Sequence, residues 1–395
     1  MIITKETMIM VKNNSTTKKC FIIAAVAMVT LVACTKMEDT APLRKITFET
    51  ATYRPQTKAD TVSIMSEFVN FKCKAFLHAA GYENETQLFF GPNGETISAY
   101  NGNNVVVTTS GSVAYWAPSH DYYWPKDPSS YINFVGWYDA KGTAPTTATE
   151  DTLKWINYVV EDNDNLLYAD EAWHYNENPR SIYHKDIADG NTASYEGVPM
   201  LFHHALSKIS VKALVTKTSE PNKTGSDEGT TIWDVTLSNF KIEGVYKQGD
   251  LVLTNEEPEP VAKTVGWTGS WTQQEGVTTD TLSRPNTTFS LTASASDIIP
   301  MRSVRPQDVT DDMVLSFDYN IDYYYQPDGG QASRYAREKI STSIPLSEFS
   351  GEIESWSMNK KITYTITINP ETSVVRIDPA MVDWVTDSGS YPNQQ

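Results

Sequence analysis

Alternation of apolar and polar residues at every second position is the feature that most constrains this sequence. Successive side chains of a β-strand point to opposite faces, so this period predicts strands with one buried face. The alternating segments are rich in Val, Ile, Thr and aromatic residues, and clusters of Gly, Pro, Asn and Asp separate them. The clearest are residues 45–53, 68–77, 104–118, 131–139, 207–215, 233–246, 287–293, 313–325 and 361–368. Because these strands are short and evenly spaced, we expect an all-β protein made of β-sandwiches.

The length of the chain, 395 residues, is enough for more than one core. In residues 198–215, VPMLFHHALSKISVKALV, the apolar positions are even-numbered before Ser207 and odd-numbered after it. Such a change of parity predicts a bulge or a switch between sheets. We place a domain boundary at the start of this segment, which divides the chain into two tandem domains, residues 34–198 and residues 199–395.

The first residues carry the pattern of an export signal. Lysines precede an apolar run at residues 21–33, which is shorter than the roughly 20 residues that span a membrane. We therefore interpret residues 1–33 as a cleaved signal peptide. The run ends in LVAC, which resembles the bacterial lipobox, where cleavage precedes a cysteine that then carries lipid. This predicts lipidation of Cys34, and an ordinary signal peptide is the alternative.

Cysteine usage predicts a chain without an internal disulfide. Of the three cysteines, Cys20 would leave with the signal peptide and Cys34 would be lipidated, which leaves Cys73 alone. Cys73 shares one face of a predicted strand with Phe71 and Ala75. We expect a buried and inert thiol.

Charge and motifs exclude several classes of function. The formal net charge of −17 argues against general binding of nucleic acid, which depends on Lys and Arg. No GxSxG elbow, Walker A loop or GxGxxG occurs, so we expect neither an enzyme nor a cofactor. The acidic residues 161–170 raise the hypothesis of a calcium-binding loop, but they lack the glycine and the distal glutamate of an EF-hand loop. We expect a solvated loop there.

The two adjacent histidines, His203 and His204, raise the hypothesis of a metal-binding site. Neighbouring side chains of a regular strand point to opposite faces, so the two cannot reach one metal. The other histidines show no zinc-binding spacing. We expect no metal, with one histidine half-buried and hydrogen-bonded and the other at the surface.

Five phrases of the sequence, taken together, resemble a known family. They are ITFETATYRPQTKAD (46–60), YYWPKDPSSYINFVGWY (122–138), DNLLYAD (164–170), VPMLFHHALSKISVKA (198–213) and WSMNKKITYTITINPETSVVRIDPAMVDW (356–384). In this order they are similar to phrases of the fimbrillin family, which comprises the type V pilins and related surface lipoproteins of Gram-negative anaerobes. The resemblance covers nearly all of the chain from Cys34 to Trp384.

The resemblance implies two tandem transthyretin-like β-sandwich domains and export as an outer-membrane lipoprotein at the cell surface or in a fimbrium. In polymerising members, an Arg- or Lys-specific protease removes the lipidated end and the first strand. A strand from the next pilin subunit then fills the open groove. Carried over, this makes Arg44, Arg54 and Lys58 candidate processing residues. Pro55 follows Arg54 and opposes trypsin-like cleavage, which favours Lys58 or no cleavage; solvated loop residues are the alternative.

The end of the chain departs from what a donated strand needs. Residues 385–395 are polar and contain Gly and Pro, and residues 372–385 contain Pro379. This favours a tip or accessory subunit, or a fimbrillin-like adhesin that mediates cell-surface adhesion, over a shaft subunit. The alternative is a monomeric, lipid-anchored protein that binds glycan or host ligand through the aromatic clusters 122–124 and 323–325. Such clusters more often pack in a core.

Overall fold

The computed structural model describes ten parts of the chain, and the contacts within residues 45–395 form one compact unit. Regular structure in the described residues is β-strand apart from one 3-10 turn, η2 (Leu346–Phe349), which confirms the all-β prediction. No helix in these parts is long and apolar enough to span a membrane. The described residues are 45–52, 68–79, 86–100, 106, 115–127, 130–175, 197–222, 228–255, 264–349 and 353–384.

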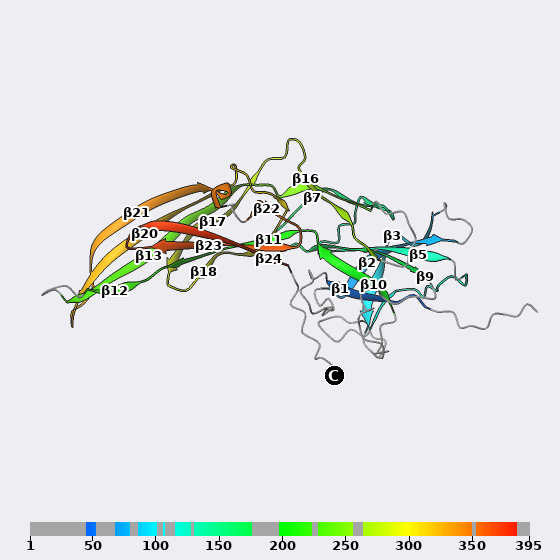
Figure 1. The fold of residues 1–395 in the computed structure, drawn as a ribbon, viewed down its shortest axis with the longest axis horizontal. Helices are drawn as coiled ribbons and strands as arrows, with labels where there is room; N and C mark the ends of the chain where they lie inside the picture. The colour runs from blue at the N-terminus through cyan, green and yellow to red at the C-terminus, as the bar shows by residue number, and fades with distance from the viewer. Residues whose placement is uncertain are drawn as a thin grey trace, which may run out of the picture. The chain divides into compact units, whose positions relative to one another are not determined.

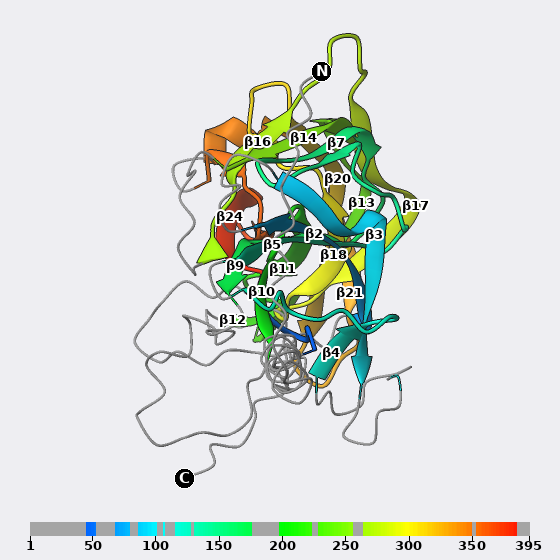
Figure 2. The ribbon, with the colours of Figure 1, turned by 90° about the vertical axis from the view of Figure 1, so that its right-hand side faces the viewer.

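The largest sheet has nine strands and closes on itself. In order of pairing, its strands are β15 (Thr264–Val265), β9 (Glu171–Tyr175), β5 (Tyr131–Asp139), β2 (Asn70–His78), β3 (Thr86–Tyr100), β4 (Tyr115–Pro118), β1 (Phe48–Thr52), β10 (Val198–His204) and β8 (Leu166–Ala169). Because β8 also pairs with β5, seven of these strands form a ring, β5-β2-β3-β4-β1-β10-β8. Figure 2 shows β2, β3 and β5 of this ring next to one another. Every pairing in the sheet is antiparallel except that of β1 with β10.

The two faces of the ring belong to two different cores. Ile132 and Phe134 of β5 join an aromatic cluster to which every strand of the ring contributes, so this cluster fills its interior. Val135 and Trp137 join a second cluster on the outside. Because both faces are covered, almost every residue of β5 is buried.

A four-stranded sheet covers the outer face of the ring. Its strands are β6 (Thr147–Ala148), β7 (Thr152–Val159), β14 (Gln248–Thr254) and β16 (Thr268–Thr272). β14 and β16 come from the second half of the chain, yet β14 pairs with β7. Figure 1 shows β16 close to β7, and Figure 2 shows β14 between them. Leu251 and Leu253 of β14 are fully buried in the outer cluster. The two halves of the sequence therefore build this layer together.

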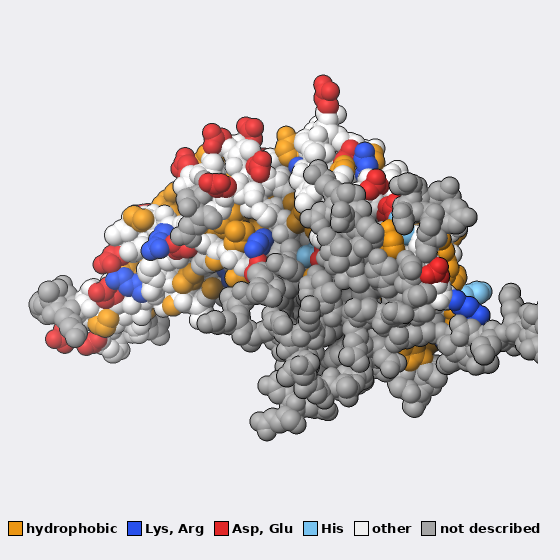
Figure 3. Space-filling model, turned by 45° about the vertical axis from the view of Figure 1, so that its right-hand side comes forward, with side chains coloured by type: hydrophobic (Ala, Val, Ile, Leu, Met, Phe, Trp, Pro, Cys, Tyr) orange, Lys and Arg blue, Asp and Glu red, His pale blue; other side chains and the backbone are white. Residues whose placement is uncertain are grey.

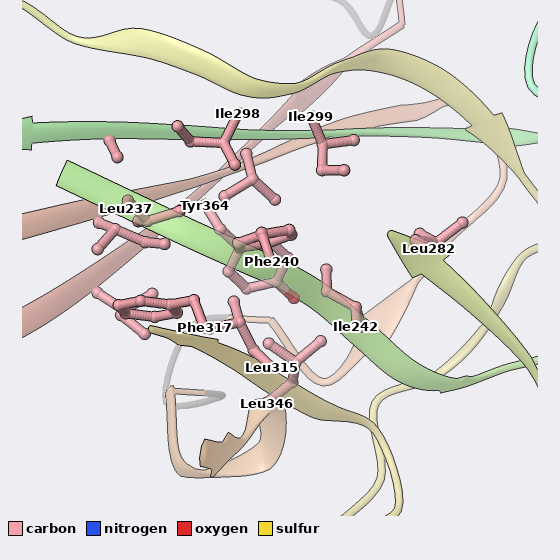
Figure 4. Close-up of a cluster of buried hydrophobic side chains, with 14 of the residues drawn as sticks. Leu237, Phe240, Ile242, Leu282, Ile298, Ile299, Leu315, Phe317, Leu346 and Tyr364 are labelled. Carbon is pink, nitrogen blue, oxygen red and sulfur yellow. The ribbon is translucent and has the colours of Figure 1, made fainter. Parts of the chain in front are cut away.

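The remaining strands form a β-sandwich around a third core. One sheet contains β18 (Ser296–Val304), β11 (Ser207–Val215), β23 (Lys360–Asn369) and β24 (Val374–Asp383). The other contains β12 (Ser219–Asn222), β13 (Gly229–Val245), β20 (Val314–Pro327), β21 (Ser333–Pro345) and β17 (Asp280–Leu291), and β19 (Gln307–Asp308) pairs separately with β22 (Ser355–Trp356). Figure 4 shows Ile298 and Tyr364 from the first sheet together with Phe240 and Phe317 from the second, all buried in one cluster.

The chain passes from one sheet to another at Ala205 and Leu206. β10 belongs to the ring and β11 to the sandwich, and the two linking residues are buried. This confirms the sheet switch that the change of parity around Ser207 predicted. The division into domains 34–198 and 199–395 stays a prediction.

Candidate functional site

The strand β1 lies between β10 and β4 and closes the ring. On one side it pairs in parallel with β10 over its five residues, from Phe48 opposite Val198 to Thr52 opposite Phe202. On the other side, Phe48 and Trp116 are the one residue pair with β4 among the described residues. Among the described residues, β1 therefore has more pairs with β10 than with β4.

The side chain of Phe48 anchors β1 in the aromatic interior. It is fully buried, and its ring meets those of Phe71 and Phe134 edge to face at centroid distances of 5.9 and 5.3 Å. Phe202 of β10 packs on the same Phe71 at 5.2 Å. Removal of β1 would leave an apolar groove between β4 and β10, lined by these rings.

The residues just before β1 hold it in register. The backbone N–H of Ile46 donates to the carbonyl of Tyr122 at 2.9 Å, and that of Val198 donates to the carbonyl of Thr47 at 2.8 Å. Lys45 forms an ion pair with Asp121, and both side chains are more than half exposed. Such an exposed pair adds little stability. The backbone bonds and the burial of Phe48 therefore carry most of the attachment.

The predicted lipidation and processing residues lie beyond the described parts of the chain. Cys34 and Arg44 precede residue 45, and Arg54 and Lys58 fall between residues 52 and 68. All four stay predictions. Arg44 immediately precedes the first described residue, and Arg54 follows the end of β1 by two residues.

The two histidines of β10 serve different contacts, as the strand geometry predicts. The Nε2 of His203 lies 2.8 Å from a carboxylate oxygen of Asp170, and its ring stacks on Tyr168. The Nδ1 of His204 is hydrogen-bonded to Asn165 at 3.0 Å. The expectation of a surface histidine is wrong, because His204 is 1% exposed.

The burial of His204 has a cause far away in the sequence. Its imidazole stacks on the indole of Trp384 with ring centroids 3.7 Å apart. Burial, followed by the positive charges of Lys208 and Lys361, holds the pKa of His204 well below its usual value. His204 is therefore neutral at pH 7 and acts as a packing residue.

The acidic residues 161–170 are only partly a loop, so the expectation of a solvated loop is wrong for most of them. Residues 166–169 form β8 and are buried, as are Asp164 and Asp170. The ammonium of Lys141 lies 2.7 Å from a carboxylate oxygen of Asp164 and 4.2 Å from the ring centroid of Tyr158. It also donates to the carbonyl of Val159. Lys141 therefore neutralises the buried carboxylate of Asp164.

No spacing rule relates Lys141 to Asp164, and this is why the sequence did not reveal the pair. In the described parts of the chain, no three His, Cys, Asp or Glu side chains are grouped to hold a metal.

Cys73 is a free and fully buried thiol, as predicted, and burial raises its pKa.

The comparison of sequences decides the family. The profile described as fimbrillin-like matches residues 83–384. The chain belongs to the fimbrillin-like family. Membership confirms the family resemblance, and four of the five phrases lie within the matched residues, whereas the phrase at 46–60 precedes them. It supports a structural role at the cell surface, as a fimbrial subunit or adhesin, rather than catalysis. No curated protein matches the sequence significantly.

Several solved structures are similar to this fimbrillin-like chain over most of its length, at low sequence identity and low TM-score. A fimbrial protein from Bacteroides vulgatus is 17% identical, with a TM-score of 0.40 over 87% of this chain and 100% of its own. A protein from Bacteroides uniformis, provisionally assigned to cell adhesion, is 15% identical, with a TM-score of 0.41 over 86% and 98%. The fimbrial anchor protein Mfa2 from Porphyromonas gingivalis is 9% identical, with a TM-score of 0.25 over 88% and 99%.

In the aromatic clusters 122–124 and 323–325 of the fimbrillin-like chain, Trp124 is buried and the tyrosines are half-buried. Trp124 is 4% exposed and meets Phe134 at 5.9 Å, and Tyr122 stacks on Phe90 at 4.4 Å. Tyr323 donates its hydroxyl to the carbonyl of Pro370. Core packing is therefore the role of Trp124. Charged side chains are scattered over the described surface in Figure 3.

Proposed function

We propose that this chain is a fimbrial subunit of the tip or accessory kind that reaches the surface as a lipid-anchored precursor. After its lipidated end and β1 are removed, it accepts a strand from another pilin subunit in place of β1. The observation that carries the proposal is the position of β1, which closes the ring between β4 and β10 and places the buried ring of Phe48 in its aromatic interior. Its loss would uncover main-chain hydrogen-bonding groups and an apolar groove in one step. Both are what an added strand needs.

The processing residues fit this proposal by their positions. Cleavage after Arg54 or Lys58 would release the lipidated Cys34 together with the whole of β1. Cleavage after Arg44 would release the lipid but keep β1 in the chain. The position of the cut therefore decides whether the groove opens.

The accessory position draws support from β24. This strand pairs with β23 over its whole length, from Val374 opposite Asn369 to Asp383 opposite Lys360. Donating it to a neighbour would break that ladder, and Pro379 within it has no N–H to offer. We infer that the chain accepts a strand and gives none, as expected for a subunit at the end of an assembly. Its transthyretin-like domains and its adhesive role belong to the same proposal.

The test is the N-terminus of the protein sheared from the cell surface. Mass spectrometry is expected to find chains that begin at Pro55 or Ala59, bound to other subunits. The variant with Arg54→Ala and Lys58→Ala is expected to keep β1 and to stay out of the assemblies. A matched control, Lys241→Ala, changes a lysine whose partner Glu243 is also exposed, and it should assemble normally.

Anchoring is tested separately with Cys34→Ser. This variant is expected to lose metabolic labelling by palmitate and to leave the outer-membrane fraction. Intact, monomeric protein that starts at acylated Cys34 as the only surface form would overturn strand exchange and leave the anchored, ligand-binding protein as the better account.

A further inference from the structure

Arg305 is a buried arginine that has no acidic partner among the described residues. It lies between β18 and β19, and 3% of the residue is exposed. Its Nε is buried without an acceptor within hydrogen-bond distance. The guanidinium carbon lies 5.3 Å from the ring centroid of Tyr246, which is its one charge-stabilising contact in the described parts of the chain. The positive charge is therefore not neutralised by a carboxylate there.

A neighbouring arginine shows what the ordinary solution would be. Arg302 places a guanidinium nitrogen 3.1 Å from a carboxylate oxygen of Asp162. Arginine stays protonated in proteins, and a buried charge without a partner is strongly unfavourable. Retaining Arg305 in a buried position without a partner therefore calls for a function or a ligand.

The strand next to Arg305 is shaped to admit the guanidinium. Gly249 stands near the start of β14, at a shift in the pairing with β7. A Cβ there would lie 2.8 Å from a terminal nitrogen of Arg305 and 2.7 Å from the carbonyl oxygen of Thr272. A glycine within a strand weakens it and marks a place where another group approaches the backbone. This is a second, independent indication that the position of the guanidinium matters.

Gln307 fixes the arginine against the same backbone. Its side-chain amide donates to the carbonyls of Tyr246 and Arg305 at 3.2 and 3.0 Å, and its oxygen accepts from the N–H of Tyr246 at 2.9 Å. The backbone segments around residues 246 and 305 are thus held together, which keeps Arg305 beside Tyr246.

We propose that Arg305, framed by Tyr246 and Gly249, binds a small oxyanion of the phosphate or carboxylate type. The planar fork of a guanidinium fits two oxygen atoms of such a group. The bound anion would neutralise the charge and strengthen the junction between β14 and the segment before β19. This site is independent of strand exchange at β1.

The test is the thermal unfolding of the full chain with increasing sodium phosphate or sodium acetate, against sodium chloride at matched ionic strength. Phosphate raises the midpoint temperature of unfolding of many proteins in a way that does not saturate with concentration. Binding to the proposed site is therefore indicated by the part of the rise that saturates. At a hundredfold excess over Kd we expect a gain of about 5 °C. Calorimetric titration with the same salts gives Kd directly, and the two salts show whether tetrahedral or planar oxyanions bind.

Variants separate the site from general salt effects. Arg305→Gln is expected to lose the saturating rise, and Arg305→Lys, which keeps the charge but not the fork, to bind more weakly. Arg284→Gln, which changes an arginine over Phe289, is expected to respond like the parent. The proposal is overturned if the parent chain shows no saturating response to either salt, or if Arg305→Lys keeps the parent's Kd. These two outcomes stand even if Arg305→Gln does not fold.

Discussion

The imidazole of His204 lies flat on the indole of Trp384, with ring planes 8° from parallel. The ammonium of Lys208 lies 4.1 Å from the centroid of the same indole. The backbone N–H of Trp384 donates to the carbonyl of Asn359, whose own N–H donates to the carbonyl of Leu206. The last described residue of the chain is therefore fastened to the link between the ring and the sandwich.

Acid is expected to weaken this contact. The folded-state pKa of His204 is lowered, first by burial and then by Lys208 and Lys361, so the unfolded chain binds a proton more readily. Neutral His204 makes its full contribution to the free energy of unfolding above about pH 6.5. As the pH falls below this value, the free energy of unfolding decreases by at most about 1.4 kcal/mol per pH unit. Urea unfolding between pH 7.5 and pH 5 measures it. His204→Phe keeps a stacking ring and should reduce the slope, whereas His120→Gln, at an exposed position, should not.

Loss of the indole is expected to be costly. Trp384 is 1% exposed, and Trp384→Ala removes a large buried side chain together with the His204 and Lys208 contacts. We expect a loss of about 4 kcal/mol in the free energy of unfolding. Val382→Ala, on the same strand at 60% exposure, should change it by less than about 0.5 kcal/mol. Equal effects of the two variants would show that the stack does not hold the chain end.

Phe48 is expected to carry most of the stability that β1 provides. Phe48→Ala opens a cavity beside Phe71 and Phe134 and should cost about 4 kcal/mol, measured by urea unfolding. Tyr335→Ala truncates an aromatic side chain that is 61% exposed, and it should cost less than about 1 kcal/mol. A small effect of Phe48→Ala would mean that β1 is not packed in the ring in solution.

The pair of Lys141 and Asp164 is expected to show energetic coupling. The Asp164 side chain is 6% exposed, so Lys141→Met leaves a buried carboxylate without its ion-pair partner and should cost about 2 kcal/mol. Adding Asp164→Asn should recover part of this loss, and the double-mutant cycle should give a coupling of about 1 kcal/mol. The exposed pair Lys241 and Glu243 serves as the control, with a coupling near zero. Additive effects at Lys141 and Asp164 would contradict the contact.

The first half of the chain is expected to need the second for folding. A fragment of residues 34–206 retains the ring strands but lacks Leu251, Leu253 and Trp267, which cover its outer face. We expect the fragment to unfold without a cooperative transition, whereas the full chain unfolds cooperatively. Circular dichroism measured at increasing urea concentrations monitors both. A cooperative transition at the midpoint of the full chain would show that the fragment is an independent domain.

Local pattern was sufficient for strands whose burial follows the sequence. The expected strands 131–139 and 207–215 match β5 and β11 at both ends, because apolar and β-branched residues fill them. The strand 333–345 was missed, since it lies at a sheet edge and most of its side chains are exposed and polar. The strand 86–100 was missed because the GPNG run within it reads as a turn, although two glycines with positive φ let the chain continue through it.

Contacts between distant parts of the chain were beyond the reach of pattern. The burial of His204 depends on Trp384, and the neutralisation of Asp164 depends on Lys141. The residues around His204 or Asp164 in the sequence do not predict which distant residue contacts it. The same holds for the pairing of β7 with β14, which places strands from the second half over the ring. Sequence therefore predicted the class of fold and the sheet switch, but not the residues that join the layers.

The parallel pairing of β1 with β10 also sets the order of events when the chain folds. Phe48 leaves the ribosome and crosses the membrane long before Val198, its partner in the ladder. Until β10 has crossed the membrane, β1 lacks its five backbone pairs, and the aromatic interior of the ring lacks Phe202. Contacts of such high sequence separation form slowly and leave apolar edges exposed meanwhile. The newly exported chain therefore passes through a period in which its ring is open and its first strand is free, and it needs protection from aggregation until the ring closes.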